Sequence, residues 1–243
     1  MKLDEISVIV PALNEAGNLS QTAEAIFNAV HGLPVCLEIL LINDGSRDET
    51  GSLANQLAGR YSEIRVIHHS EPKGLGFCYR EGIRRATYPR VVMIPGDNEI
   101  EETSIRRMFE ASVMCDSVLL FIGNTSVRSP VRRLISSFYV QLLNFLFGLK
   151  IRYYNGPCIL SKERVREVML STDGFGYMSA IVVQLAKMGV SLHEVEMRLK
   201  PRTYGQTKFF TFRNIWSVLT MLVRLYYKIY LSPQRRRWYT NVS

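Results

Sequence analysis

The sequence lacks the patterns of several protein classes. Its four cysteines, Cys36, Cys78, Cys115 and Cys158, are scattered without a C-x-x-C pair, which disfavours a disulfide framework or a zinc site and is typical of buried thiols in a reducing compartment. No apolar run reaches the roughly 18 residues of an ordinary spanning helix. No signal-peptide pattern precedes the first predicted strand. These absences together predict a cytoplasmic protein.

Common catalytic patterns are missing as well. The four histidines, His31, His68, His69 and His193, show no metal-ligand or triad spacing, and we interpret them as structural or exposed. No Ser-His-Asp or Cys-His arrangement is apparent. No G-x-G-x-x-G motif follows the first predicted strand, which disfavours a dinucleotide oxidoreductase.

The composition is that of a globular protein with an anionic partner. Of the 243 residues, 47% are hydrophobic and 21% are charged, so the chain can bury a substantial core. The formal net charge is +8. Such an excess of positive charge favours association with nucleic acid, an anionic membrane surface or a phosphorylated ligand.

The first half of the chain alternates short apolar runs with helical periodicity. This alternation predicts an α/β fold whose central sheet is mostly parallel and covered on both faces. No internal repeat or low-complexity linker is visible, so we expect one main domain. The predicted strands cover residues 6–10, 37–42, 65–68, 91–94 and 118–122, and the predicted helices cover 19–30, a segment after Asp48 and Glu49, and 74–86.

An acidic turn, Pro95-Gly96-Asp97-Asn98-Glu99, directly follows the fourth predicted strand. Open α/β sheets bind their ligands at the carboxyl ends of such strands. Asp97 and Glu99 alternate along the chain, so in an extended segment both carboxylates point to one side. Clustered hard oxygen ligands of this kind bind a divalent cation. The alternative interpretation is a solvated acidic turn.

Two later segments have the pattern of amphipathic helices. Ser129 and Pro130 suit an N-cap and a first helical position, and an apolar stripe continues to residue 149. Residues 209–231 form a second such segment, followed by Arg235-Arg236-Arg237-Trp238-Tyr239. Apolar faces beside basic and aromatic residues are typical of helices in a membrane interface. Packing of both stripes on the sheet is the alternative; nucleic acid is the rival partner of the basic C-terminus, and the apolar bulk disfavours it.

Five motifs follow one another at strand ends. They are Val-Pro-Ala-Leu-Asn-Glu (10–15), Asn-Asp-Gly-Ser-Arg-Asp-Glu-Thr (43–50), Lys-Gly-Leu-Gly (73–76), Pro-Gly-Asp (95–97) and Arg-Thr-Tyr-Gly-Gln-Thr-Lys (202–208). In this order they resemble family 2 glycosyltransferases of the GT-A fold, most closely the polyprenyl-phosphate sugar transferases typified by dolichyl-phosphate mannose synthase. The resemblance implies a Rossmann-like catalytic domain over residues 1–208, which includes an amphipathic helix at 129–149. It also implies a basic, membrane-associating segment at 209–243.

The resemblance also implies a nucleotide-sugar site. Carboxylates there accept hydrogen bonds from base or ribose, and glycines let the chain approach the ligand closely. Asp97, with Glu99 beside it, would bind Mg²⁺ or Mn²⁺, which neutralises the donor diphosphate as it leaves. The residues expected to bind the nucleotide sugar are Pro11, Leu13, Glu15, Asp44, Lys73, Gly96 and Asp97.

The acceptor phosphate would be bound by basic residues of the second half. Arg132 and Ser136 are i and i+4 on the predicted helix and share a face. A phosphate monoester is largely a dianion at neutral pH, so it needs no general base, and its direct attack inverts the anomeric carbon. Asp97 and Arg202 are the expected catalytic residues. The residues implied for the acceptor phosphate are Arg128, Arg132, Ser136, Arg202 and Lys208.

The sequence departs from the family pattern at several positions. Pro95 replaces the first Asp of the Asp-x-Asp motif, and Asn43 replaces an expected Asp, so metal preference and base recognition are open. On the acceptor side, Thr125 stands where relatives have an Arg, for which Arg128 is a substitute, and Arg152 and Cys158 replace an acidic residue and an Arg around Asn155-Gly156.

We therefore expect metal-dependent, inverting sugar transfer, with mannose from GDP-mannose favoured, to a dolichyl- or undecaprenyl-type phosphate. The enzyme would be peripheral or monotopic at the cytoplasmic face of a membrane, with a small anchoring subunit or a second copy as a further partner. One alternative is a UDP-glucose or UDP-N-acetylhexosamine donor. Another is a hydroxyl acceptor, with Asp173 as the nearest candidate carboxylate. A third is a non-catalytic nucleotide-sugar binder, motivated by Pro95.

Overall fold

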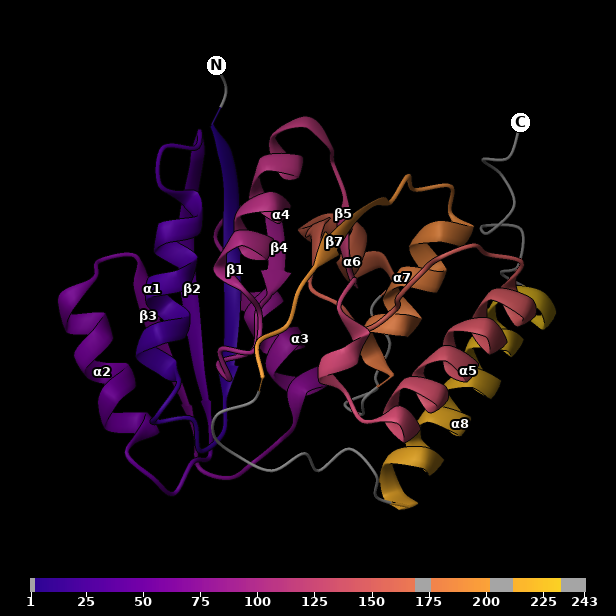
Figure 1. Ribbon diagram of the computed structural model, residues 1–243, viewed down its shortest axis with the longest axis horizontal. Coiled ribbons are helices and arrows are strands. Elements are labelled where there is room, and N and C mark those ends of the chain that lie inside the picture. The colour runs from indigo at the N-terminus through magenta and orange to yellow at the C-terminus, as the bar shows by residue number, and fades with distance from the viewer. Residues whose placement is uncertain (1–2, 169–175, 202–211, 233–243) are drawn as a thin grey trace.

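The computed structural model describes residues 3–168, 176–201 and 212–232 (Figure 1). Its centre is one seven-stranded sheet. The strands are β1 (Asp4–Ala12), β2 (Val35–Asp44), β3 (Ile64–His69), β4 (Arg90–Met93), β5 (Val118–Ile122), β6 (Cys158–Ser161) and β7 (His193–Met197). Their order is β3-β2-β1-β4-β6-β5-β7. Among the described strands, β6 alone runs antiparallel to its neighbours, β4 and β5, so the predicted mostly parallel sheet is confirmed.

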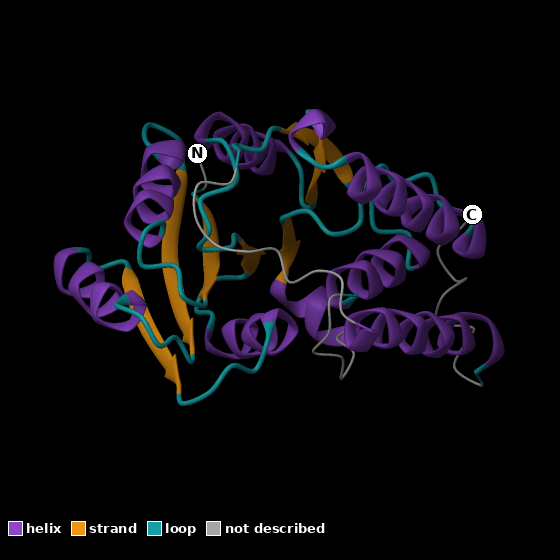
Figure 2. Ribbon diagram, turned by 60° about the horizontal axis from the view of Figure 1, so that its bottom comes forward, coloured by secondary structure: helices purple, strands orange, loops and turns teal. Residues whose placement is uncertain are grey.

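Helices cover both faces of this sheet (Figure 2). Their buried side chains divide into two cores, one that includes α1, α2 and α4 and another that includes α3 and α5–α8. The helices are α1 (Leu19–Val30), α2 (Thr50–Arg60), α3 (Leu75–Arg85), α4 (Glu102–Met114), α5 (Pro130–Phe147), α6 (Lys162–Val168), α7 (Tyr177–Lys187) and α8 (Phe212–Tyr226), with short helical turns at Thr125–Val127 and Tyr227–Leu231.

Strand β1 lies inside the sheet, between β2 and β4, and contributes side chains to both cores. Ile6, Val8 and Val10 pack into one core, while Ile9 points to the other, as expected where successive side chains alternate across a strand. Its β-branched residues suit a pleated surface that is buried on both faces. Because β1 runs parallel to both β2 and β4, the carboxyl ends of all three strands meet at one edge of the sheet.

The predicted strands and helices of the first half are confirmed within a few residues. The predictions contained neither the antiparallel strand β6 nor the final strand β7. The predicted N-cap is confirmed, because the Ser129 hydroxyl accepts a hydrogen bond from the Arg132 backbone N–H at 3.4 Å and Pro130 begins α5. All four cysteines are free; Cys78 and Cys158 are buried as predicted, and Cys36 and Cys115 are half-buried.

The helical turn that continues α8, Tyr227–Leu231, packs on the rest of the protein. The Lys228 ammonium group donates to the Gln184 carbonyl oxygen at 2.6 Å, and the Tyr230 ring stacks on Phe147 with their centroids 6.2 Å apart. The predicted boundary between residues 208 and 209 lies outside the described residues and stays a prediction.

Candidate functional site

The end of β4 runs beside the end of β1. The backbone N–H of Gly96 donates to the Pro11 carbonyl at 3.0 Å, and a Cβ added to Gly96 would lie 3.1 Å from that of Ala12. Two of the residues predicted to bind the donor, Pro11 and Gly96, are thus neighbours. This pairing places Asp97 at the edge of the sheet where open α/β folds bind their ligands.

The loops after β1 and β2 are joined by hydrogen bonds. The backbone N–H of Asn14 donates to the Ser46 hydroxyl at 3.0 Å, and that of Glu15 donates to the Thr50 hydroxyl at 2.8 Å. In return, the Asn14 side-chain oxygen accepts from the Arg47 backbone at 2.9 Å. The first two predicted motifs therefore form one unit, from which the Leu13 side chain is exposed.

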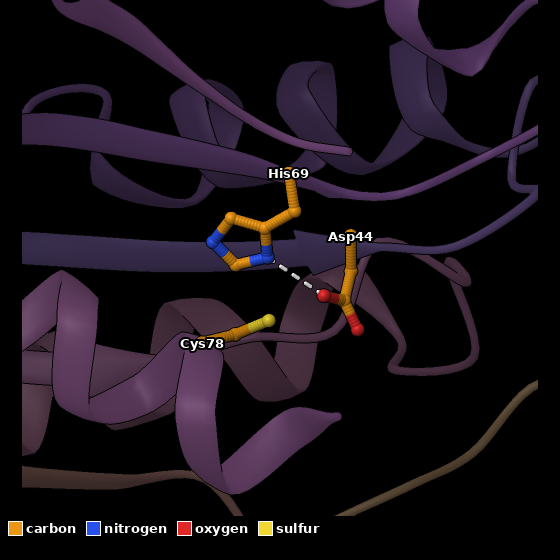
Figure 3. Close-up of side chains that lie close together, drawn as sticks. All are labelled: Asp44, His69 and Cys78. Carbon is orange, nitrogen blue, oxygen red and sulfur yellow. Dashed lines mark hydrogen bonds and ion pairs between the residues drawn. The ribbon is translucent and has the colours of Figure 1, made fainter. Parts of the chain in front are cut away.

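Asp44, the last residue of β2, is buried, and its side chain points toward His69 and Cys78 (Figure 3). Its Oδ1 accepts from the Lys73 backbone N–H and its Oδ2 from that of Gly74, both at 2.9 Å. The His69 Nδ1 lies 2.7 Å from Oδ1. Burial alone would raise the pKa of Asp44, but these three hydrogen bonds outweigh it and hold the pKa below its ordinary value. Direct contact between Asp44 and a nucleotide stays a prediction.

Asp44, His69 and Cys78 also form a group with metal-ligand chemistry, their ligand atoms all within 4.8 Å of one another. Two observations favour a structural role. Burial, followed by the nearby Asp44 charge, raises the pKa of the Cys78 thiol well above its ordinary value, whereas metals bind the thiolate. Both His69 ring nitrogens lie at hydrogen-bond distance from carboxylates, 2.7 Å from Asp44 and 2.7 Å from Glu81. We interpret the group as an anchor for the loop that carries Lys73.

The predicted metal ligands Asp97 and Glu99 lie together in a tight turn after β4. The Glu99 backbone N–H donates to Asp97 Oδ1 at 3.2 Å, and Asn98 between them has a left-handed backbone with φ 52°. Both carboxylates are half-buried at the edge of the sheet. Hard carboxylate oxygens from two neighbouring residues fit Mg²⁺ or Mn²⁺, which take their remaining ligands from phosphate and water.

A segment that follows β7 lies along this turn. The Lys200 backbone N–H donates to the Glu99 carbonyl at 2.7 Å, and the Lys200 ammonium group donates to the Asn98 side chain at 2.8 Å. No local pattern predicts Lys200 at this site, because its position depends on the bridge between Ile100 and Leu199. Arg202 and Lys208 follow in the chain but lie outside the described residues, so their roles stay predictions.

Helix α5 and the loop after it enclose a cleft of about 650 Å³, which we call the basic cleft. Arg128 and Ser136, both predicted to bind the acceptor phosphate, line it; Arg132 is not among the lining residues. Of the described residues that line it, none is acidic. The lining includes the cationic side chains of Arg128, Arg133, Lys150 and Arg152 and the apolar side chains of Ile122, Val140, Leu149 and Ile151.

Aromatic rings hold two of these guanidinium groups. The Arg128 guanidinium lies 5.7 Å from the centre of the Tyr153 ring, with its two terminal nitrogens 3.5 and 3.4 Å from the Tyr153 hydroxyl. The Arg152 guanidinium lies 4.6 Å from the centre of the Phe121 ring. The buried Nε of Arg128 has no hydrogen-bond partner in the described structure. The cleft thus offers preformed positive charge to an anion.

An exposed apolar surface adjoins the cleft on α5. Helix α5 buries only Leu143 and Phe147, and Trp216 of α8 is exposed as well. Both helices lie at the end of the molecule opposite β3 (Figure 1). We call the exposed apolar side chains of these two helices together the α5–α8 surface; they are Val131, Leu134, Ile135, Phe138 and Phe145 from α5, and Trp216, Leu219, Val223 and Tyr226 from α8. The interpretation that both apolar stripes only pack on the sheet does not account for these exposed residues.

Known proteins resemble the chain in sequence. The family described as Glycosyl transferase family 2 matches residues 7–168. A dolichol-phosphate mannosyltransferase of Pyrococcus furiosus is 28% identical over 74% of this chain, a match that spans only 53% of that protein. A polyprenol monophosphomannose synthase of Mycolicibacterium smegmatis is 27% identical over 83% of this chain and 79% of its own length.

Solved structures share the fold. Glucosyl-3-phosphoglycerate synthase of Mycobacterium tuberculosis, in complex with Mn²⁺, UDP-glucose and phosphoglyceric acid, superposes with a TM-score of 0.69 over 91% of this chain and 80% of its own, at 18% identity. This likeness supports the GT-A fold and nothing finer. The family match covers most of the chain and includes the end of β4 and the loops that surround it. The chain therefore belongs to glycosyl transferase family 2.

Proposed function

We propose that this glycosyltransferase moves a sugar from a nucleotide donor to the phosphate of a polyprenyl phosphate, with mannose from GDP-mannose as the favoured donor. The names of its relatives, which include an undecaprenyl-phosphate mannosyltransferase of Micrococcus luteus at 24% identity, support this proposal. The observation that carries it is the position of the basic cleft beside an exposed apolar surface. A lipid phosphate needs both kinds of surface.

Helix geometry explains how α5 presents both. Successive residues of an α-helix turn by about 100°, so Arg133, Ser136 and Val140 share one side of α5. Leu134 and Phe138 lie on the other side of the helix, roughly 100–160° around its axis from these three residues, and are exposed. A lipid phosphate in the cleft and an isoprenoid chain on the apolar side would therefore contact different sides of α5.

The donor would lie across the ends of β1, β2 and β4. Glu15, Asp44 and Lys73 belong to the three loops that surround this edge, and a divalent cation would be held by Asp97 and Glu99. Such a cation supplies charge neutralisation of the departing diphosphate. The protein itself orients the two substrates, offers the cationic side chains and excludes water. The acceptor dianion is its own nucleophile, so a single displacement inverts the sugar.

The protein would work on the surface of a membrane, and we place it at the cytoplasmic face. In the described part of the chain, no helix has both the length and the hydropathy that crossing a bilayer requires. The α5–α8 surface and the basic residues of 209–243 would instead lie in the interface. A small anchoring subunit or a second copy of the chain stays a proposed partner.

UDP-glucose and UDP-N-acetylhexosamines are the alternative donors, because Asn43 departs from the family pattern and the structural neighbour was solved with UDP-glucose. A hydroxyl acceptor would require a catalytic carboxylate, and the candidate Asp173 lies outside the described residues. A non-catalytic binder would bind a nucleoside diphosphate without transferring sugar.

Radiolabelled GDP-mannose, UDP-glucose and UDP-N-acetylglucosamine, each supplied with polyprenyl phosphate and Mg²⁺ or Mn²⁺, would identify the donor by label in the organic phase. Arg128→Gln should lower transfer at subsaturating lipid by about tenfold, since it removes one charge-assisted hydrogen-bonding group. Arg107→Gln, the same charge change on the exposed part of α4, is the matched control. Transfer of no label from any donor, although nucleoside diphosphates raise the melting temperature, would favour the non-catalytic binder.

A further inference from the structure

His69 connects two carboxylates inside the protein. Its side chain is 4% exposed, its Nδ1 lies 2.7 Å from Asp44 and its Nε2 lies 2.7 Å from Glu81. Each ring nitrogen is thus at hydrogen-bond distance from one carboxylate, so the imidazole links the two acidic side chains. Glu81 in turn accepts from the Arg85 guanidinium at 3.0 Å, so a series of polar contacts leads from the surface to Asp44.

At its inner end, this series of contacts reaches the loop that carries Lys73. Asp44 accepts from the backbone N–H groups of Lys73 and Gly74 with its two separate oxygens, so the orientation of its carboxylate fixes two consecutive peptide units. A Cβ at Gly45 would fall on the backbone of Glu71 and Pro72, and Gly45 has a left-handed φ of 71°. The loop therefore lies directly on the end of β2, where a small rotation of Asp44 would move it.

The side chains of Lys73, in this loop, and of His69 and Phe77, in the elements on either side of it, also contact one another. The Lys73 ammonium group lies 4.7 Å from the centre of the Phe77 ring, and the edge of His69 meets the same ring with centroids 5.4 Å apart. His69 thus supports Lys73 in two ways, through the backbone by Asp44 and through the side chain by Phe77. In the proposed reaction, His69, Asp44 and Phe77 transfer no proton and form no bond, so their role would be to position the loop.

We propose that His69, with Glu81 behind it, is a positioning residue that holds the loop of Lys73 and Gly74 in the geometry that binds the nucleotide-sugar donor. This inference rests on the proposed function, because it takes the donor to lie against this loop. Without His69, the Asp44 and Glu81 carboxylates would lose the hydrogen-bonding group that lies between them, and the repulsion between two nearby carboxylates would favour rotation of at least one of them. Asp44 would then lose the orientation that serves both N–H groups.

The test compares His69→Gln and Glu81→Gln with Arg65→Gln. Arg65 lies on the same strand, and its pairing with Glu38 is at the opposite end of β3, so this control breaks an ion pair without touching the loop. Glu81→Gln keeps His69 in place and remains informative if His69→Gln folds poorly. GDP and UDP binding with Mg²⁺ is measured by calorimetry, alongside melting temperature and the KM values for donor and lipid.

We expect His69→Gln to raise the nucleotide Kd and the donor KM by about tenfold, with a smaller rise for Glu81→Gln and an unchanged lipid KM for both. Arg65→Gln should lower the melting temperature and leave the nucleotide Kd unchanged. Unchanged nucleotide affinity in folded His69→Gln, or an equal rise in the lipid KM, overturns the inference. If the wild-type protein binds neither GDP nor UDP, the proposed function fails, and the inference with it.

Discussion

Replacement of two exposed phenylalanines on α5 should release the protein from membranes. Phe138 and Phe145 belong to the α5–α8 surface, with exposed fractions of 64% and 85%. Because they contact little of the protein, Phe138→Gln together with Phe145→Gln should change the free energy of unfolding by no more than about 0.5 kcal/mol per site.

The magnitude follows from the exposed fractions. Full burial of a phenylalanine side chain contributes roughly 1.5–3 kcal/mol. Scaled by the 64% and 85% that remain to be buried, the two residues contribute together about 3 kcal/mol. The double variant should therefore bind vesicles on the order of 100-fold more weakly.

Cosedimentation with vesicles of phosphatidylcholine and phosphatidylglycerol measures this partition. Met114→Gln is the matched control, because Met114 is also 85% exposed but lies at the end of α4. The membrane assignment of α5 would be refuted if the double variant bound like the wild type, or if Met114→Gln lowered binding equally.

Three further predictions concern the metal, the core and acid stability. Asp97→Ala should abolish nearly all transfer while the melting temperature changes little, and Glu99→Ala should be milder and partly restored by excess Mg²⁺ or Mn²⁺; an active Asp97→Ala enzyme would exclude Asp97 as the main metal ligand. Gly82→Ala should cost about 1–3 kcal/mol in urea unfolding, since the new Cβ would lie 2.6 Å from the Ile9 side chain, whereas a neutral or stabilising effect would mean that Ile9 moves aside freely. Hydrogen bonds hold the pKa values of Glu38 and Asp44 below their ordinary values in spite of burial; their contribution to stability is therefore complete above the unfolded pKa of about 4 and is lost as pH falls through the folded pKa. Urea titrations from pH 6 to pH 2 should show that loss, and Asp44→Asn should flatten it.

Local patterns were sufficient to predict most of the sheet. The apolar runs of β1, β2 and β4 are buried on both faces, so their sequences are almost uninterrupted by polar residues. Strand β6 is only four residues long and runs against its neighbours, a direction that pairing decides and periodicity does not. The partly exposed β7 has little apolar signal, because Glu194 and Glu196 interrupt it.

In the candidate site, too, local patterns predicted some residues, whereas the positions of others depend on contacts between distant parts of the sequence. Asp97 and Glu99 lie where the end of an apolar run predicted them, whereas of the pair Arg132 and Ser136, predicted to share a helix face, only Ser136 lines the basic cleft. The engagement of Asp44 depends on His69 and on the backbone of Lys73 and Gly74, contacts between residues 25 to 30 positions apart that no local pattern encodes. Lys150 and Arg152 likewise join the basic cleft only because the loop after α5 folds back on it.

The acceptor decides the proposed function, and one assay tests it directly. The purified protein is given labelled donor sugar with either polyprenyl phosphate or the matching polyprenol in the same vesicles, and label is counted in the organic phase. We predict transfer to the lipid phosphate alone, because only the phosphate is both a ready nucleophile at neutral pH and a partner for the cations of the basic cleft. Equal transfer to both lipids, or transfer only to a water-soluble acceptor, would contradict this account.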